Sequence, residues 1–236
     1  MINLQNITKI YRTGDNETEV FRDFNLFVDD GEYVAVMGRS GSGKTTLLNI
    51  IGAMDGFDSG RYMYNDAEVN KLDRHGLEQF RRNHISYVFQ NYFLINYYSV
   101  RENIELPLIA KGIKRKQRRE IAEQKMELAG ISDIADKLPA YISGGQMQRC
   151  AIARALASGN DILLADEPTG ALDYHTSKEI LKLIEDVNIK YGNTVIMVTH
   201  NEAIRHMADH VIKLRDGEVR HNEINTDKVS AADLEW

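Results

Sequence analysis

The 236-residue sequence predicts an α/β fold with a mainly parallel sheet, an N-terminal antiparallel β subdomain and an inserted α-helical subdomain. Three observations indicate this fold. An apolar run at residues 33–37 precedes a glycine-rich turn, and further continuous apolar runs occupy residues 162–165 and 194–198. Such runs are typical of parallel strands buried on both faces. Residues 91–159, by contrast, have helical patterns and no comparable buried strand.

The N-terminal part is expected to hold strands followed by the start of a βαβ unit. Residues 2–11 and 20–28 have strand patterns, and the polar residues 13–16 between them predict a loop in a small antiparallel sheet. The strand at 33–37 and the helix-forming pattern from 45 to 51 predict the first half of a βαβ unit.

Helices are expected in the insertion and between the last two buried strands. A helix over residues 114–129 is indicated by apolar residues on one stripe and by Gly130 as its stop. A second helix, from about residue 174 to 191, is predicted to cross over between the strands at 162–165 and 194–198.

The chain has no repeat and no low-complexity tract, so we interpret residues 1–236 as one domain. Residues 1–90 and 160–220 are expected to form its core, residues 91–159 its helical subdomain and residues 221–236 a polar C-terminal tail.

Composition limits the class of protein. A hydrophobic fraction of 43% and a charged fraction of 27% are ordinary for a soluble globular chain. The net charge of −6 argues against a nucleic-acid partner, because phosphate neutralisation needs excess Lys and Arg. A single cysteine, Cys150, excludes an intrachain disulfide and indicates a reducing compartment, and we expect it to pack within a helix. Without a signal segment or an 18-residue apolar run, the chain is expected to be cytosolic or peripheral.

The most specific local signal is a complete G-x-x-x-x-G-K-[ST] phosphate loop between a buried strand and a helix. Backbone N–H groups of such a loop and the helix N-terminus point at one anion. Lys44 is expected to reach the terminal phosphates, and the Thr45 hydroxyl to bind Mg²⁺. A flexible glycine turn would explain the glycines but not the Lys-Thr pair. The predicted nucleotide-binding set is Gly38, Arg39, Ser40, Gly41, Ser42, Gly43, Lys44, Thr45 and Thr46.

Two carboxylates follow the apolar strand at residues 162–165. Asp166 at the carboxyl edge of the sheet is expected to lie beside the phosphate loop and hold the metal. Neighbouring side chains diverge at a strand end, so Glu167 can face the γ-phosphate and orient or deprotonate an attacking water. Alone, an acidic pair at a strand end is equally consistent with a solvated loop start. After a phosphate loop, the catalytic interpretation is favoured.

A third motif identifies the family. Ser143, Gly144, Gly145 and Gln146, followed by the run from Met147 to Leu156, closely resemble the signature sequence of ATP-binding cassette ATPases. Ser143 can cap a helix whose N-terminal amides form a second anion site. The resemblance implies that this segment completes the ATP site of a partner subunit in a head-to-tail dimer. A capped amphipathic helix alone leaves the Gly-Gly-Gln sequence unexplained.

The resemblance covers residues 1 to about 220 and implies further roles. Tyr11 matches the aromatic residue that stacks on adenine, although a tyrosine at a strand end also suits packing. Gln90 matches the glutamine that contacts Mg²⁺ and joins the two lobes. Asp173 matches the residue that contacts the opposite subunit. Without the resemblance, it would be interpreted as a helix N-cap. His200 matches the switch histidine on the γ-phosphate, which makes it, with Glu167 and Lys44, a predicted catalytic residue. Ile142, Arg39 and Thr45 depart mildly from the usual family residues.

Residues 52–56, 102–108 and 166–173 most resemble one subgroup of the family, whose ATPases serve macrolide and antimicrobial-peptide exporters, lipoprotein release and the cell-division FtsE type. The resemblance implies ATP and Mg²⁺ as cofactors and a homodimer or pseudo-symmetric dimer. It also implies an integral membrane permease partner at the cytoplasmic face of the cell membrane. An FtsE-like regulator that signals without moving a substrate is the alternative, and a soluble cassette ATPase acting on DNA or ribosomes is disfavoured.

Two surfaces bear on partners. Aromatic residues at 92–98 lie near Gln90, where the resembling family receives a short permease helix. We give equal weight to two interpretations of these residues: an exposed docking surface for such a helix, and part of the core of the helical lobe. A basic run at 111–119 is interpreted as a solvated helix face rather than a lipid contact, because positive charge at a helix start is mildly unfavourable.

Overall fold

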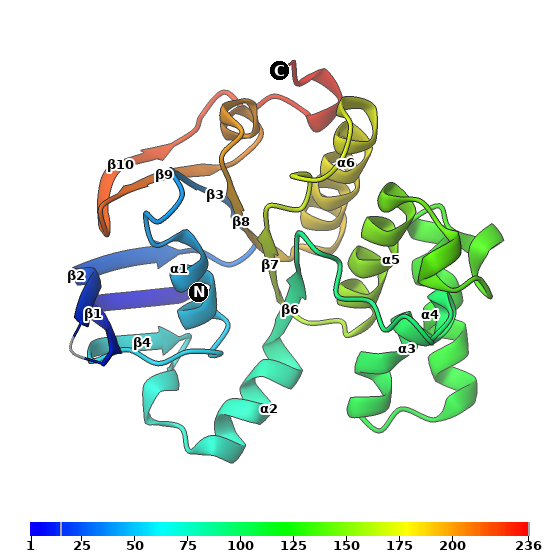
Figure 1. The fold of residues 1–236 in the computed structure, drawn as a ribbon, viewed down its shortest axis with the longest axis horizontal. Coiled ribbons are helices and arrows are strands. Elements are labelled where there is room, and N and C mark those ends of the chain that lie inside the picture. The colour runs from blue at the N-terminus through cyan, green and yellow to red at the C-terminus, as the bar shows by residue number, and fades with distance from the viewer. Residues whose placement is uncertain (15, 236) are drawn as a thin grey trace.

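Two β-sheets and a lobe of helices make up the part of the chain that the structure describes, residues 1–14 and 16–235 (Figure 1). In this computed structural model a four-stranded sheet has the order β2-β1-β4-β5, and a six-stranded sheet has the order β10-β9-β3-β8-β7-β6. Figure 1 shows helices α3, α4 and α5 on one side of β6 and β7 and the N-terminal sheet on the other. The predicted α/β fold with a helical insertion is confirmed.

The N-terminal sheet is antiparallel, and its first two strands are longer than the sequence predicted. β1 (Ile2–Thr13) pairs with β2 (Asn16–Val28) up to the pair Thr13↔Asn16. The predicted four-residue loop at 13–16 is therefore wrong, because both of its end residues belong to paired strands. Asp15, also part of that prediction, lies outside the described residues. The sheet is completed by β4 (Ser59–Tyr64) and β5 (Ala67–Glu68).

The central sheet is parallel except at one edge. Parallel pairs join β9 (His210–Arg215) to β3 (Tyr33–Gly38), β3 to β8 (Thr194–Thr199), and β8 to β7 (Ile162–Asp166). β6 (Ile85–Val88) continues the parallel pairing beyond β7, and β10 (Glu218–Ile224) pairs antiparallel with β9.

Both faces of this sheet are covered, and this explains the continuous apolar runs. Alternate residues of β3 enter two different hydrophobic clusters: Ala35 packs with the helical lobe, whereas Val34 and Val36 pack with the N-terminal sheet. All three are fully buried. Burial of a Val or Leu side chain contributes about 1.5–3 kcal/mol, so these strands anchor both halves of the fold.

Helices cover the two faces and form the insertion. α1 (Lys44–Ile51) follows the glycine-rich turn, and α6 (Tyr174–Tyr191) is the crossover from β7 to β8. α4 (Arg115–Leu128) agrees with the prediction for residues 114–129. The other α-helices are α2 (Arg74–His84), α3 (Val100–Ala110) and α5 (Gly144–Ala157). Short 3-10 helices are η1 (Val69–Lys71), η2 (Ser132–Ile134), η3 (Pro139–Tyr141), η4 (Glu202–His206) and η5 (Ala231–Asp233).

The predicted polar tail is docked on the core. Its described part, residues 221–235, holds the end of β10 and η5. Ala231 and Leu234 are buried in the same hydrophobic cluster as Ile184 of α6. Figure 1 shows this red segment beside α6. Trp236 lies outside the described residues.

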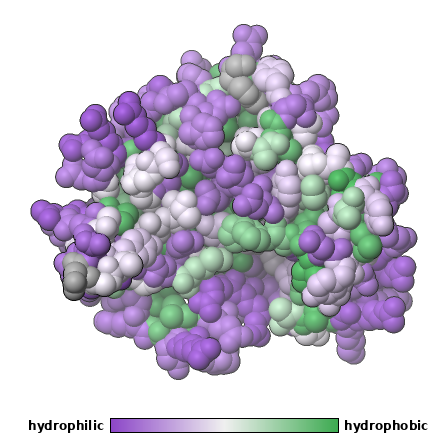
Figure 2. All heavy atoms as spheres, in the orientation of Figure 1, coloured by the Kyte–Doolittle hydropathy of each residue, from purple (hydrophilic) through white to green (hydrophobic). Residues whose placement is uncertain are grey.

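The face of the molecule drawn in Figure 2 is mostly polar. Figure 2 shows a hydrophilic face on which hydrophobic residues gather in the middle and over the helical lobe. Among the helices that the structure describes, none combines the length and the apolar character needed to cross a membrane.

Cys150 is expected to resist thiol reagents in the native protein. It lies fully buried in α5, as predicted, and burial raises the pKa of its thiol to about 12. The thiolate is the reactive form, so its population at neutral pH falls roughly 10³-fold relative to a free thiol. Mass spectrometry after iodoacetamide treatment should find unmodified native protein and full modification in denaturant. Rapid modification without denaturant would contradict this burial.

Candidate nucleotide site

The phosphate loop connects β3 to α1, and a glycine sets its geometry. Gly43 caps α1 with a φ of 100°, in the left-handed region that favours glycine. A Cβ there would lie 2.9 Å from Cε1 of Phe21 in the N-terminal sheet. The loop is therefore held between both sheets, and its amides and the start of α1 form a cradle for phosphate.

Lys44 folds back over this loop. Its ammonium donates to the carbonyls of Gly38 at 2.8 Å and Arg39 at 3.0 Å, and the residue is buried. An ammonium has three donors, so one remains for an anion. The side chain is thus held in place at the centre of the loop.

Thr45 and Asp166 approach each other from different elements. The Thr45 hydroxyl, at the start of α1, donates to Oδ2 of Asp166, at the end of β7, over 3.3 Å. Burial raises the pKa of Asp166, and the Thr45 hydrogen bond opposes that shift. A hydroxyl and a carboxylate are hard oxygen donors, and Mg²⁺ binds such groups at about 2.0–2.1 Å. Their 3.3 Å separation therefore fits two neighbouring ligands of one ion.

The Thr45–Asp166 pair fits an open metal site rather than a closed protein cage. Within residues 1–14 and 16–235, no group of three or more His, Cys, Asp or Glu side chains could hold a metal ion. Mg²⁺ usually keeps waters and binds one or two protein groups together with substrate phosphates. The Thr45–Asp166 pair suits that kind of site, in which the ion would neutralise phosphate charge.

Glu167 and His200 face each other across the ends of two adjacent strands. Nδ1 of His200, after β8, lies 3.2 Å from Oε2 of Glu167, after β7. Glu167 has a φ of 45°, unusual for a residue with a side chain, and its N–H donates to the carbonyl of Val198 over 2.9 Å. Strained backbone of this kind costs about 1–3 kcal/mol and is found at functional sites. Here it marks the residue whose side chain meets His200.

One open cavity collects most of these groups, although Asp166 is not among its described lining residues. Its volume is about 570 Å³. We call it the Lys44 pocket, and it is lined by Val20, Ser40, Gly41, Gly43, Lys44, Thr45, Thr46, Glu167 and His200. Gly38, Arg39 and Ser42 of the predicted set line a neighbouring cavity on the other side of the loop, which Ser40, Gly41 and His200 also border. The structure therefore brings the phosphate loop, a carboxylate and a histidine to one place.

Gln90 lies at the junction of the lobes. A Cβ on Gly170 would lie 2.9 Å from its Nε2, which places the side chain against the loop that follows Glu167. Tyr92 and Phe93, just after it, both have positive φ values, 59° and 46°. Arg154 of α5 donates to both of their carbonyls, at 2.7 and 2.6 Å. These two hydrogen bonds could not be predicted from the sequence, because no sequence pattern connects Arg154 to backbone carbonyls some 60 residues away.

The signature segment stands apart from the Lys44 pocket. Ser143 caps α5 in a capping box: its hydroxyl accepts from the Gln146 N–H at 3.3 Å, and its own N–H donates to Gln146 Oε1 at 3.0 Å. A Cβ on Gly145 would lie 2.6 Å from Cγ2 of Thr176 at the start of α6. Residues 143–146 are not among the described residues that line the Lys44 pocket. A role for them at an ATP site requires a second subunit.

Asp173 is an N-cap, one of the two readings that the sequence allows. Its carboxylate accepts from the N–H and the hydroxyl of Thr176, at 3.0 and 2.7 Å, and these bonds lower its pKa. Asp173 and Gly145 therefore meet on the same residue, Thr176. Contact of Asp173 with an opposite subunit stays a prediction.

Tyr11 is exposed at the end of β1. Its hydroxyl donates to Asp55 over 2.8 Å, and the Lys9 ammonium lies 4.5 Å from its ring centroid. It is not among the described residues that line the Lys44 pocket, so adenine stacking stays a prediction.

Comparison with known proteins gives consistent matches. The family model described as ABC transporter matches residues 21–170. The macrolide export ATP-binding/permease protein MacB 1 of Escherichia coli is 41% identical over 231 residues, which cover 98% of this chain and 36% of that protein. MacB of Shigella flexneri is 40% identical over 232 residues, with the same coverage. The chain thus spans about a third of the length of these relatives.

Solved structures agree in fold. The ATP-binding cassette MJ0796, as a dimer in a post-hydrolysis state bound to ADP and phosphate, matches with a TM-score of 0.88 and 40% identity. That match covers 95% of this chain and 98% of the other. The protein cbiO1 of Clostridium perfringens, part of the transporter complex cbiONQ, matches with a TM-score of 0.85 and 26% identity over 94% and 88% of the two chains.

Proposed function

The chain belongs to the ABC transporter family as one of its ATPases, and on that premise we propose that it dimerises around two ATP molecules and powers a membrane permease. The observation that carries the proposal is the Lys44 pocket, which combines a phosphate cradle, a fixed ammonium and the Glu167–His200 pair. These are the groups that ATP hydrolysis needs in one place.

In this proposal each group has a separate role. The loop amides and Lys44 bind the terminal phosphates, and Thr45, Asp166 and Gln90 would hold Mg²⁺. Glu167 orients the attacking water and accepts its proton. His200, 3.2 Å from Glu167, fixes that carboxylate and contacts the γ-phosphate. Catalysis would then consist of positioning and charge stabilisation, as is usual for phosphoryl transfer.

The second half of each site would come from a partner subunit. The capped start of α5 and Asp173 lie next to each other, so one surface could meet the ATP bound by another copy. The matching cassette MJ0796 is itself a dimer, which supports this arrangement. A head-to-tail pair of identical surfaces closes as a two-fold dimer with two equivalent sites.

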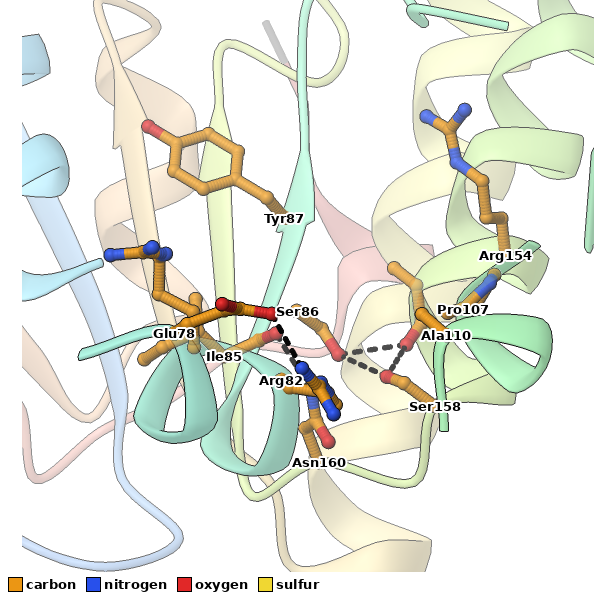
Figure 3. Close-up of a pocket in the computed structure, with 12 residues that line it drawn as sticks. Glu78, Arg82, Ile85, Ser86, Tyr87, Pro107, Ala110, Arg154, Ser158 and Asn160 are labelled. Atoms are coloured by element: carbon orange, nitrogen blue, oxygen red, sulfur yellow. Dashed lines mark hydrogen bonds and ion pairs between the residues drawn. The ribbon is translucent and has the colours of Figure 1, made fainter. Parts of the chain in front are cut away.

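A groove between the lobes is our candidate for the permease contact. Its volume is about 410 Å³, and it is bordered by α2, β6, α3 and α5. Figure 3 shows Glu78 and Ile85 on one side and Pro107, Ala110 and Ser158 on the other. Hydrogen bonds of Ser86 to the Ala155 carbonyl and of Asn160 to the Ile85 carbonyl, at 2.8 and 2.7 Å, fix its floor. Such a groove suits a short helix from a partner.

The groove is connected to the segment that carries Gln90 through Arg154. Arg154 lines the groove and donates to the carbonyls of Tyr92 and Phe93, which follow Gln90. A partner helix bound in the groove could therefore shift the segment that carries Gln90. Phe93 and Tyr97 are exposed beside this segment, which favours the docking interpretation of the aromatic cluster over helical-lobe core. The relatives are named macrolide export ATP-binding/permease proteins, which supports export of a drug-like cargo. Export of antimicrobial peptide or lipid-linked cargo, and a place at the cytoplasmic face of the membrane, stay predictions.

Cross-linking at the groove tests this proposal. Ala110 is exposed on its rim, so Ala110→Cys adds a reactive thiol, whereas Cys150 is buried with a raised pKa and stays silent. In native membranes a short thiol-to-amine cross-linker should join this cysteine to an integral membrane protein, identified by mass spectrometry. The same variant in the isolated chain should keep wild-type ATPase activity, because Ala110 is far from the chemistry.

The control is Ile189→Cys, which places an exposed thiol on α6. It should not capture the same protein. A ribosomal or DNA-bound partner captured at Ala110→Cys would contradict the permease assignment. Reconstitution of the captured complex then separates export from FtsE-like signalling, since only an exporter moves a substrate when ATP is hydrolysed.

A further inference from the structure

Residues 225–235 form a strap that is bonded to two segments of the site. At one end it meets η4, which begins two residues after His200. Asn225 donates from Nδ2 to the carbonyls of Arg205, His206 and Ala208, at 3.4, 3.2 and 3.1 Å. The Val229 N–H adds a bond to the His206 carbonyl at 2.8 Å. The end of η4 is therefore held by the strap.

At its other end the strap is anchored on α6. Glu185, buried in the middle of that helix, accepts from the Ser230 hydroxyl and the Ala231 N–H, each at 3.1 Å. Nearer the start of α6, the Tyr174 hydroxyl donates to the Leu234 carbonyl over 3.2 Å. Tyr174 directly follows Asp173 in the sequence. The strap thus reaches the helix turn that carries Asp173.

Apolar packing makes these contacts one unit. Ala231 and Leu234 of the strap and Ile204 of η4 are all buried in the hydrophobic cluster that includes Ile184 of α6. A buried carboxylate that has lost its donors is costly, by about 1–3 kcal/mol or more for a charged group. Glu185 also accepts from the Lys182 ammonium of the same helix at 2.8 Å, and the Ser230 and Ala231 bonds supply its other donors, so these bonds favour the observed position of the strap.

We propose that the strap is a positioning element for ATP hydrolysis: through Asn225 and Glu185 it fixes the His200 segment relative to the helix turn of Asp173. This inference rests on the roles proposed above for His200 and Asp173. Reacting groups that are misplaced by about 1 Å can lose up to about 10²-fold in rate. Loosening the strap should therefore slow the chemical step while the phosphate loop, which the strap does not touch, still binds ATP.

Two substitutions cut the strap at different ends. Asn225→Ala removes the donor to three η4 carbonyls, and Glu185→Leu keeps a similar side-chain volume but removes the acceptor of the Ser230 and Ala231 bonds. Each should lower kcat for ATP hydrolysis by about 10-fold and leave KM within about twofold. Asn225→Asp should be at least as severe as Asn225→Ala, because a carboxylate facing carbonyls cannot donate. The double variant should resemble either single one, since both act on one unit.

Asn70→Ala is the matched control. Asn70 also bonds to backbone, since its Oδ1 accepts from the Tyr62 N–H at 2.9 Å, but it lies in η1 beside the N-terminal sheet, away from the strap. Its Tm should fall while kcat at 25 °C stays at the wild-type value. Wild-type kcat in folded Asn225→Ala and Glu185→Leu proteins, or a raised KM at unchanged kcat, would overturn the strap inference alone. A wild-type chain without ATPase activity would overturn the proposed function as well.

Discussion

Glu167→Gln should abolish ATP hydrolysis and leave ATP binding intact. The amide has nearly the same shape as the carboxylate but cannot accept a proton, and loss of a general base costs about 10²–10⁴-fold in rate. The Lys44 ammonium and the loop amides, which bind phosphate in our proposal, are untouched. Single-turnover hydrolysis measured beside nucleotide binding separates the two effects.

The same variant should accumulate as a dimer in the presence of ATP. If ATP joins the phosphate loop of one subunit to the signature segment of the other, an uncleaved nucleotide holds the pair together by mass action. Removing one carboxylate from each net-negative chain also lowers the repulsion between subunits. Size-exclusion chromatography with ATP should show a dimer for Glu167→Gln and mainly monomer for wild type.

Glu120→Gln is the charge control for this experiment. Glu120 is exposed on α4, in the helical lobe, so its replacement removes one charge without touching the site. It should hydrolyse ATP like wild type and stay mainly monomeric. Normal turnover by Glu167→Gln would remove that carboxylate from its proposed role. An inactive Glu167→Gln protein that stays monomeric at saturating ATP would contradict the ATP-bridged dimer.

Much of the central sheet could be predicted because burial on both faces gives its strands a continuous apolar sequence. Val34, Ala35 and Val36 are buried on alternate faces, so both faces demand apolar residues and the run is continuous. β10 has no such signal, because nearly all of its residues are exposed and its position depends on backbone pairing with β9. The loop prediction at 13–16 was wrong for the same reason: Thr13 and Asn16 are polar but paired.

The candidate site divides in a similar way. The phosphate loop is a local motif, so its residues could be recognised in sequence order. The 3.2 Å contact of Glu167 with His200 depends on the adjacency of β7 and β8. The strap could not be predicted, because Asn225 bonds to backbone carbonyls, which every residue type presents. Side chains that recognise backbone leave no sequence pattern at their partners.

Two inactive variants should restore activity when they are mixed. Lys44→Ala deletes the cation from the phosphate loop, and ATP binding at that loop should be lost. Ser143→Asp keeps an N-cap acceptor for the Gln146 N–H but places a negative charge toward the partner's γ-phosphate. Gly145 is a poorer choice, because a Cβ there would lie 2.6 Å from Thr176. Each homodimer should be inactive, since both of its sites lack one half.

Heterodimers of the two variants contain one intact site, and this decides the outcome. With random pairing and independent sites, ATPase activity should recover to roughly one quarter of wild type, because half of the dimers have one of two sites working. Ser143→Asn, an equally good neutral cap, should stay active on its own, which isolates the effect of the charge. Different affinity tags on the two chains establish that heterodimers have formed. Tagged heterodimers without activity would contradict independent sites, and an active Ser143→Asp homodimer would contradict the placement of this segment against the partner's phosphate.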